Sequence, residues 1–190
     1  MKLNMGNRRV WLLRGLVAVA VGLMITSAIM PWWICTITIP YEEISKPLHI
    51  EIYQYGLQHD LVQLRDHIEA DETPFYQTVL AWVYIAASVG LILYSTWLKG
   101  RKGKWLLGGI GFSYIAYAAI AVIWIAIRTG DFGIKLLGLS SQSYEGTVYV
   151  SVSHNASLEP GYYLAYAAGL LCIALALLGN KITGRPKLNT

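Results

Sequence analysis

Four long apolar runs without a charged residue divide the chain into five polar segments. The runs cover residues 15–34, 76–98, 105–127 and 162–179. A run of about 20 apolar residues is long enough to cross a hydrocarbon core of about 30 Å as a helix. The pattern therefore predicts an all-α membrane fold, a four-helix bundle forming a single integral membrane domain over residues 1–190.

The first run has a second interpretation. Three arginines precede it and small residues at 26–28 offer a cleavage site, as in a secretory signal peptide. The run is long for a signal core, however, and it closes with Pro31, Trp32 and Trp33. Tryptophans are typical of a membrane interface, so we interpret the run as a membrane span.

The polar segments 35–74 and 128–160 carry strand patterns. Residues 35–39 and 49–53 alternate in the period of half-buried strands, with two prolines for a turn between them. Residues 147–153 alternate again and predict a third strand that pairs with the first segment. We expect a small β-layer on one side of the membrane.

Residues 57–70 change to a helical period. Leu57, Leu61, Leu64 and Ile68 recur three or four residues apart, with polar and charged residues between them. This spacing predicts one short amphipathic helix that ends before Thr73-Pro74.

Small residues four apart predict where the spans contact one another, because they let helix backbones approach closely in lipid. The connection over residues 99–104 is short, so spans two and three are expected to be neighbours. The same small residues would also suit a contact between two copies of the chain. The predicted packing positions are Gly161, Ala165, Gly169, Ala18, Gly22, Gly109 and Ser113.

Charge follows the same division of the chain. All eleven acidic residues lie in segments 35–74 and 128–160, whereas segments 1–14, 99–104 and 180–190 hold eleven of the fifteen Lys and Arg and no acid. Basic flanks are retained in the cytoplasm. We therefore expect a multi-pass protein of the cell (plasma) membrane with N- and C-termini cytoplasmic and an extracellular β-layer.

Composition excludes several classes of protein. With 55% hydrophobic residues the chain is too apolar for a soluble domain. Its net charge of +4 averages a basic side and an acidic side, so it is no sign of nucleic-acid binding. Cys35 and Cys172 lie at different depths and are not expected to form a disulfide.

The candidate metal ligands are few. His59, Asp66 and His67 lie near one another in the sequence, with His49 and His154 in the predicted strands, but seven-residue spacings place ligands about 10 Å apart along a helix. A solvated charged face explains them as well, and we predict neither a metal nor another cofactor. The sequence Asn155-Ala156-Ser157 matches the N-glycosylation pattern, so Asn155 is a glycosylation candidate.

The spans contain no ionisable Asp, Glu, Lys, Arg or His, which a monomeric transporter would need at mid-membrane. Their polar atoms include Tyr84, Tyr114 and Tyr117, which are placed to meet between spans two and three. The chain also lacks the HExxH, CxxC, GxSxG, P-loop and dinucleotide patterns. The sequence therefore predicts no enzymatic activity and no catalytic residue.

Four passes, a long first loop with strands and a short helix, and a shorter second loop with one strand resemble the layout of the claudin and peripheral-myelin-protein superfamily. The resemblance covers nearly the whole chain, but the family's loop pattern of Trp, Gly-Leu-Trp and two cysteines is absent. The resemblance implies a β-layer on a four-helix bundle, used for contact with other proteins.

From these features we expect a non-enzymatic protein whose ordered outer loops mediate protein–protein contact. Besides the lipid bilayer, its expected partners are copies of itself or other membrane proteins, and not nucleic acid. Two alternatives stay open: a small oligomeric channel or transporter, and an accessory subunit of a metal-dependent membrane enzyme.

Overall fold

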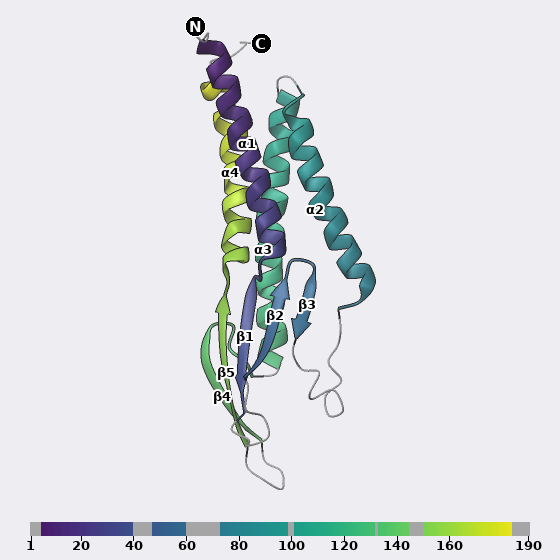
Figure 1. The fold of residues 1–190 in the computed structure, drawn as a ribbon, viewed down its shortest axis with the longest axis vertical. Coiled ribbons are helices and arrows are strands. Elements are labelled where there is room, and N and C mark those ends of the chain that lie inside the picture. The colour runs from purple at the N-terminus through teal and green to yellow at the C-terminus, as the bar shows by residue number, and fades with distance from the viewer. Residues whose placement is uncertain are drawn as a thin grey trace. The chain divides into compact units, whose positions relative to one another are not determined.

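The computed structural model describes residues 5–39, 47–59, 73–98, 101–131, 133–144 and 150–183. These residues form four helices and five strands (Figure 1). In chain order they are α1 (Met5–Ile29), β1 (Trp33–Thr38), β2 (Leu48–Tyr53), β3 (Gly56–His59), α2 (Phe75–Ser95), α3 (Arg101–Asp131), β4 (Gly138–Tyr144), β5 (Val150–Leu158) and α4 (Pro160–Thr183).

The chain divides into two compact units. Unit 1 consists of Met1–Thr26, Val83–Ala118 and Leu164–Thr190, and unit 2 consists of Ser27–Trp82 and Ala119–Tyr163. Unit 1 contains only helical segments among its described elements, whereas the whole sheet belongs to unit 2.

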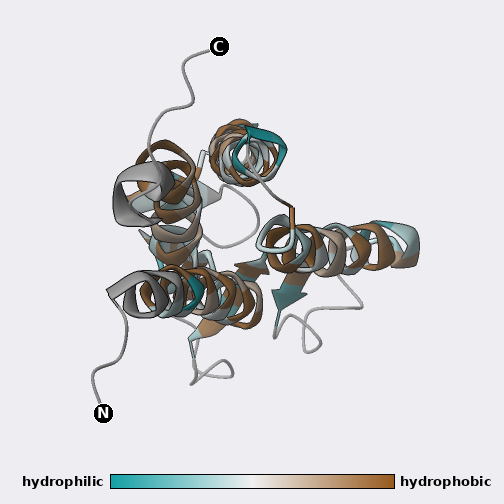
Figure 2. Cartoon of the chain, turned by 90° about the horizontal axis from the view of Figure 1, so that it is seen from above, coloured by the Kyte–Doolittle hydropathy of each residue, from teal (hydrophilic) through white to brown (hydrophobic). Residues whose placement is uncertain are grey.

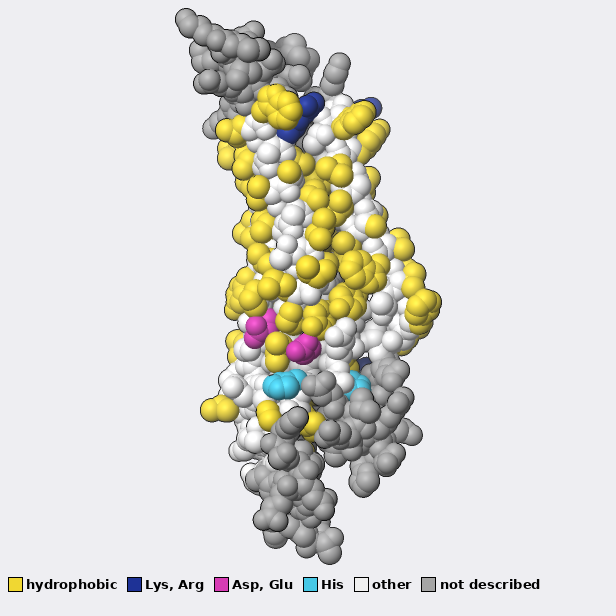
Figure 3. Space-filling view, viewed as in Figure 1, with side chains coloured by type: hydrophobic (Ala, Val, Ile, Leu, Met, Phe, Trp, Pro, Cys, Tyr) yellow, Lys and Arg dark blue, Asp and Glu magenta, His cyan; other side chains and the backbone are white. Residues whose placement is uncertain are grey.

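All four helices are long and apolar enough to cross a membrane. Hydrophobic residues predominate along each of them (Figure 2), and hydrophobic side chains cover their visible surface (Figure 3). Leu80, Phe112 and Leu177 are 63%, 69% and 74% exposed. So large an apolar surface is suited to lipid and not to water. The chain is a multi-pass membrane protein with a membrane helical fold and a small antiparallel sheet.

The first helix ends earlier than the sequence predicted. The predicted span continued to Ile34, but α1 ends at Ile29 and β1 begins at Trp33. Pro31 explains the break, because proline cannot donate a backbone hydrogen bond and disfavours helical geometry in the residue before it. The apolar residues that follow belong to a buried strand.

Close backbone contact joins α3 and α4 in unit 1. A Cβ atom built at Gly111 would lie 2.6 Å from the carbonyl oxygen of Gly169, and one built at Gly169 would lie 2.6 Å from Ile115 Cγ1. Ala165, a predicted packing position of α4, is fully buried. Here small residues let two helices approach, as helix association in lipid requires.

The predicted small residues of α1 and α3 lie elsewhere. Ala18 and Gly22 are exposed, as are Gly109 and Ser113, and nothing lies within 4 Å of a Cβ built at Gly22 or Gly109. Among the described residues, Ala18, Gly22 and Gly109 therefore do not pack against another helix. The buried side chains of α1 in unit 1 are Val17, Ala20 and Met24.

Tyrosines link α2 to α3, as the sequence predicted. The Tyr84 ring lies 6.2 Å from the Tyr114 ring and 5.3 Å from the Tyr117 ring, measured between centroids. The hydrogen bond of Tyr84 is made with Ser113, over 3.1 Å. Ser113 thus acts as a polar partner of α2, which is why it is not a small-residue contact.

The sheet of unit 2 is antiparallel throughout and has the strand order β3-β2-β1-β5-β4. The predicted pairing of residues 35–39 with 49–53 is observed between β1 and β2, while most of the turn lies outside the described residues. Residues 150–153 of the third predicted strand belong to β5, which pairs with β1, while residues 147–149 lie outside the described residues.

The predicted amphipathic helix over 57–70 is wrong at its start. Residues 57–59 belong to β3, and residues 60–70 lie outside the part of the chain that the structure describes. Gly56 has a φ of +152°, a conformation that few other residues adopt, and it lets the chain turn back beside β2 after only two residues. The turn places Leu57 in a strand, and the other three apolar residues of the predicted helix lie outside the described residues.

The passages from α1 to β1 and from β5 to α4 lie side by side in unit 2. The Glu159 amide donates to the Trp32 carbonyl over 2.9 Å, and the Gly161 amide donates to the Pro31 carbonyl over 3.1 Å. The Ser27 hydroxyl donates to the Gly161 carbonyl over 2.7 Å. We call this crossing, residues 27–32 with 159–161, the helix–sheet junction.

Gly161 is indispensable to the junction because of its size. A Cβ atom at this position would lie 2.5 Å from the Met30 carbonyl oxygen and 2.6 Å from the Pro31 carbonyl oxygen. Both are backbone atoms and cannot rotate away. The predicted packing role of Gly161 is thus a contact with the end of α1 and not with another helix face.

We predict that Gly161→Ala destabilises the protein by about 1–3 kcal/mol, the cost of forcing an extra methyl into a close-packed site. The measurement is thermal or denaturant unfolding of the full chain in mild detergent, followed by circular dichroism. Gly109→Ala is the matched control, because it adds the same methyl to a helix surface with nothing within 4 Å. It should be neutral or stabilise by up to about 1 kcal/mol. Equal effects of the two changes would contradict the assigned contact.

Candidate interaction surface

Strand pairing gives the sheet two different faces. Side chains paired in register share a face, and successive residues alternate between faces. Trp33, Cys35 and Ile37 of β1 therefore point to one face, which we call the packed face. Thr36 and Thr38 point to the other, which we call the open face.

The packed face holds the core of unit 2. Trp33, Cys35, Ala156 and Ile125 of α3 are buried together, and half-buried side chains of β1, β2 and β5 surround them. The Trp33 indole donates a hydrogen bond to the Leu136 carbonyl over 2.8 Å, which fixes the chain that leads into β4. Burial raises the pKa of the Cys35 thiol to about 11, so this cysteine is not a reactive thiolate at neutral pH.

His154 is the polar exception on the packed face. It is 4% exposed, and it lies in register with Ile37 and Ser140. The imidazole of His154 makes a hydrogen bond with the backbone of Ser140. Its Nδ1 atom has no hydrogen-bond partner among the residues that the structure describes. Burial lowers the pKa of His154 below its ordinary value of 6.5, so the neutral form is favoured.

The open face is polar and organised by local hydrogen bonds. Thr36 Oγ1 lies 3.2 Å from His49 Nδ1, and Ser157 Oγ donates to Glu159 over 2.7 Å. Tyr53 donates to Glu51 over 2.6 Å. This hydrogen bond, with a smaller contribution from burial, raises the pKa of Tyr53 to about 12. These hydrogen bonds hold several of the polar side chains in place on an exposed face.

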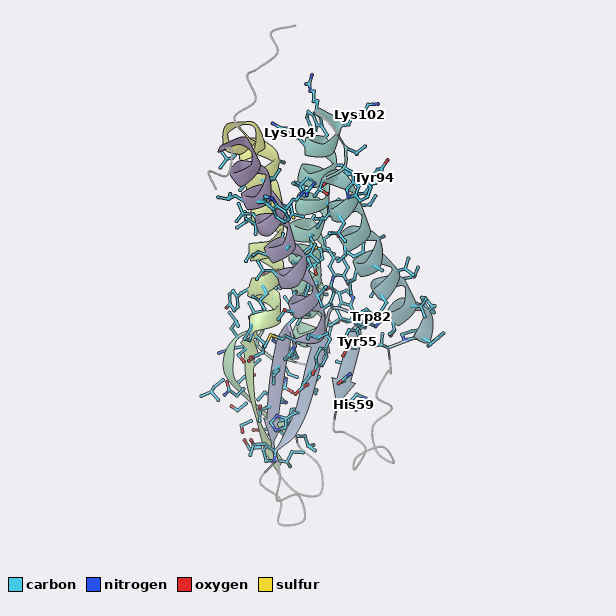
Figure 4. All side chains as sticks on the ribbon, turned by 45° about the horizontal axis from the view of Figure 1, so that its top comes forward. Tyr55, His59, Trp82, Tyr94, Lys102 and Lys104 are labelled. Carbon is cyan, nitrogen blue, oxygen red and sulfur yellow. The ribbon has the colours of Figure 1, made fainter. Side chains whose placement is uncertain are left out.

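An aromatic stack ties the β2–β3 turn to α2. The Tyr55 ring lies between Tyr53 and Trp82, with centroid distances of 5.2 and 5.3 Å and nearly parallel planes. Figure 4 shows Tyr55 and Trp82 facing each other from the turn and from α2. Stacked rings contribute about 0.5–1.5 kcal/mol beyond their buried area, so the turn is held firmly.

The two edges of the sheet differ. The β3 edge is four residues long, and the Leu57 amide donates to the Thr73 hydroxyl over 2.8 Å, so this edge is covered at its centre. The β4 edge is seven residues long, and no strand among the described residues pairs with its outer side. Leu139, Ser141 and Ser143 of β4 are exposed on the open face.

Among the candidate metal ligands, the three histidines that the structure describes are not brought together. His59 lies on the packed face of β3 and His154 on the packed face of β5, three strand spacings or about 14 Å apart. His49 is on the opposite face, and Asp66 and His67 lie outside the described residues. No group of three or more His, Cys, Asp or Glu that could hold a metal occurs in the part of the chain that is described.

Asn155, the glycosylation candidate, lies in the middle of β5 with its side chain exposed on the open face. It is flanked by β1 and β4, in register with Thr36 and Leu139. A modification here would project from the open face without displacing a core side chain.

Sequence reasoning missed β4 and the role of Thr73. β4 has the sequence Gly-Leu-Ser-Ser-Gln-Ser-Tyr, without the alternation of a half-buried strand, and it is defined only by its pairing with β5. Gly56 was the available signal for β3, because an isolated glycine before alternating residues marks a tight turn.

Comparison with known proteins adds no assignment. No protein-family model matches the chain, and no curated protein sequence matches it. The four helices and the small antiparallel sheet fit the layout of the claudin and peripheral-myelin-protein superfamily only loosely.

We predict that His154 makes the stability of the protein depend on pH. Because its pKa is lowered in the fold, the unfolded chain binds more protons near pH 6. The stabilising contribution is therefore complete above about pH 6.5 and decreases as the pH falls below that value. Unfolding midpoints measured between pH 8 and pH 5 should decrease less in His154→Leu than in the unmodified protein.

His49→Leu is the matched control, since it removes an imidazole from the open face of the same sheet. It should leave the decrease below pH 6.5 in place. An unchanged pH dependence in His154→Leu would contradict the assignment.

Proposed function

We propose that this protein is a non-enzymatic four-pass membrane protein of the plasma membrane, and that unit 2 binds a second copy of the chain outside the cell. In this proposal both termini and the α2–α3 connection are cytoplasmic. The distribution of charge supports it, because basic flanks are retained inside and the acids lie in segments 35–74 and 128–160.

The open β4 edge is the observation that carries the proposal. An edge strand presents unpaired backbone donors and acceptors, and proteins that avoid association protect such edges with charges, prolines, bulges or a covering segment. The β3 edge is short and is covered by Thr73. β4 is longer and contains no charged residue and no proline. Strand addition at an exposed edge is a common mode of protein recognition.

Charge restricts where a second copy can bind. Segments 35–74 and 128–160 hold eleven acidic residues against four basic ones, so two copies repel each other over most of this surface. Leu139 to Ser143 are uncharged, and two β4 edges meet without placing like charges opposite one another. The β4 edge is therefore the place where electrostatic repulsion between two copies is smallest.

The first test addresses the orientation in the membrane. In intact cells, a membrane-impermeant maleimide should label Ser141→Cys, whereas it should label Lys102→Cys only after the membrane is permeabilised. The native Cys35 and Cys172 are fully buried and give a low background. The reverse labelling pattern would overturn the proposed topology.

The second test addresses the edge. Ser141→Lys places a charge at the centre of β4 and should weaken self-association by up to about five-fold, since like charges opposite one another in paired strands cost up to about 1 kcal/mol. Dissociation constants are measured by fluorescence energy transfer between labelled copies in mild detergent.

Two controls accompany this test. Ser153→Lys adds the same charge to the open face but on β5, at a position paired with both β1 and β4, and should associate normally. Ser141→Thr keeps the edge uncharged and should also associate. A strictly monomeric unmodified protein, or equal weakening by the two lysine variants, would refute binding through β4.

A further inference from the structure

Unit 1 has a charge imbalance that its own residues cannot neutralise. Its sequence ranges contain no Asp or Glu. They contain eleven Lys and Arg: Lys2, Arg8, Arg9, Arg14, Lys99, Arg101, Lys102, Lys104, Lys181, Arg185 and Lys187. No side-chain ion pair within unit 1 is therefore possible, and the anions that balance this charge must come from outside the unit.

Most of the described cations of unit 1 lie at helix ends, and Arg14 lies in the third turn of α1. Figure 4 shows Lys102 and Lys104 at the start of α3, and the start of α1, the end of α2 and the end of α4 lie at the same end of unit 1 (Figure 1). Arg14, Arg101 and Lys102 are exposed and Lys104 is half-buried. We call these four residues the basic end.

The first turn of α3 has the wrong sign for an isolated helix. The N-terminus of a helix carries a partial positive charge that favours acidic residues, yet this turn contains Arg101, Lys102 and Lys104 and no acid. Three cations at this position repel the helix dipole and one another. An external anion at the basic end relieves both repulsions.

Exposed tryptophans indicate where that anion lies. The Arg14 guanidinium lies 5.8 Å from the Trp11 ring centroid, and that of Arg101 lies 5.9 Å from the Trp105 ring centroid. Both indoles are about two-thirds exposed, at 66% and 69%. Exposed indoles beside cations are typical of the headgroup level of a bilayer, where one part of the side chain meets lipid and the other meets water.

Apolar side chains continue along the same helices. On α1, Val19 is 52% exposed, and on α3, Phe112 is 69% exposed. On α3 the cations come first, then an indole, then a surface for hydrocarbon. On α1 the Trp11 indole comes before Arg14, and the apolar surface follows both. The cations, the indole and the apolar surface correspond to the headgroup, the interface and the acyl chains of a phospholipid. Together they extend farther along the helix than a soluble anion would.

We propose that the basic end binds the headgroups of anionic phospholipids, with the acyl chains lying along α1 and α3. The phosphate and any further negative group of the headgroup contact Arg14, Arg101, Lys102 and Lys104. The inference does not depend on the proposed binding of a second copy through β4.

The test uses the full-length protein reconstituted in phosphatidylcholine bilayers with spin-labelled lipid. Electron paramagnetic resonance gives the association of labelled phosphatidylglycerol relative to labelled phosphatidylcholine. At low salt, we expect phosphatidylglycerol to associate with the protein about two-fold or more in preference to phosphatidylcholine, averaged over all lipid positions. One surface cation raises the local preference for an anionic lipid by about five-fold. The preference should decrease in high salt. A ratio of one at low salt would refute the proposal.

Substitutions locate the effect. Arg101→Gln/Lys102→Gln/Lys104→Gln should remove at least half of the preference. The control is Arg128→Gln/Lys135→Gln, which removes cations of unit 2, including an arginine that lies 5.6 Å from the Trp124 ring centroid in the same way. It should keep the preference. If the triple variant does not fold, the exposed single variants Arg14→Gln and Lys102→Gln replace it, and each should lower the ratio.

A soluble anion serves as the competing ligand. Inorganic tripolyphosphate should not displace phosphatidylglycerol from the protein at matched ionic strength. Displacement by tripolyphosphate, or equal loss of preference in the control variant, would overturn the assignment to lipid.

Discussion

The structure of unit 2 depends on how the chain passes from helix to strand without leaving backbone groups unpaired. The last four carbonyls of a helix have no partner within it, and an unpaired backbone group away from water costs several kcal/mol. At the junction, the Trp32 indole donates to the Ser27 carbonyl over 2.9 Å, close to the end of α1. The amides of Glu159 and Gly161 in turn donate to carbonyls of residues 31 and 32. Two helix ends thus supply one another's partners.

The junction also determines the sheet. Because Trp33 and Leu158 leave the crossing as a registered pair, β1 and β5 become the central strands. Their packed-face side chains then meet Ile125, and the remaining strands add on both sides. One side closes with a short strand that Thr73 covers, and the other ends in β4. The difference between the two edges therefore follows from the position of the junction and from the length of chain on each side of it.

Sequence patterns predicted the parts of the fold that depend on one pattern repeated along a segment. Twenty apolar residues without charge fix a helix in lipid, and alternation in residues 35–39 and 49–53 fixed the β1–β2 pair. The residue at which α1 ends could not be predicted, since Trp33 and Ile34 suit a membrane helix and a buried strand equally well. The small residues Ala165 and Gly169 of α4 are packed, whereas Ala18 and Gly22 of α1 are exposed. Ala18 and Gly22 have the right size for packing, but only the fold decides which side of α1 faces its neighbours.

The candidate surface was harder to predict than the spans, because its defining strand has no pattern of its own. β4 consists mostly of serine and glutamine, and it forms only because β5 offers it a partner. β4 has no charged residue and no alternating pattern that would reveal it in the sequence. In the proposed function, the same lack of charge allows its edge to pair with another strand. Repulsion between acidic surfaces acts over about 8 Å at physiological salt, whereas backbone hydrogen bonds act over about 3 Å. In the proposed association through β4, an uncharged edge within an acidic surface allows contact at that one place, and the charges that keep the rest of the surface apart also select the strand that pairs.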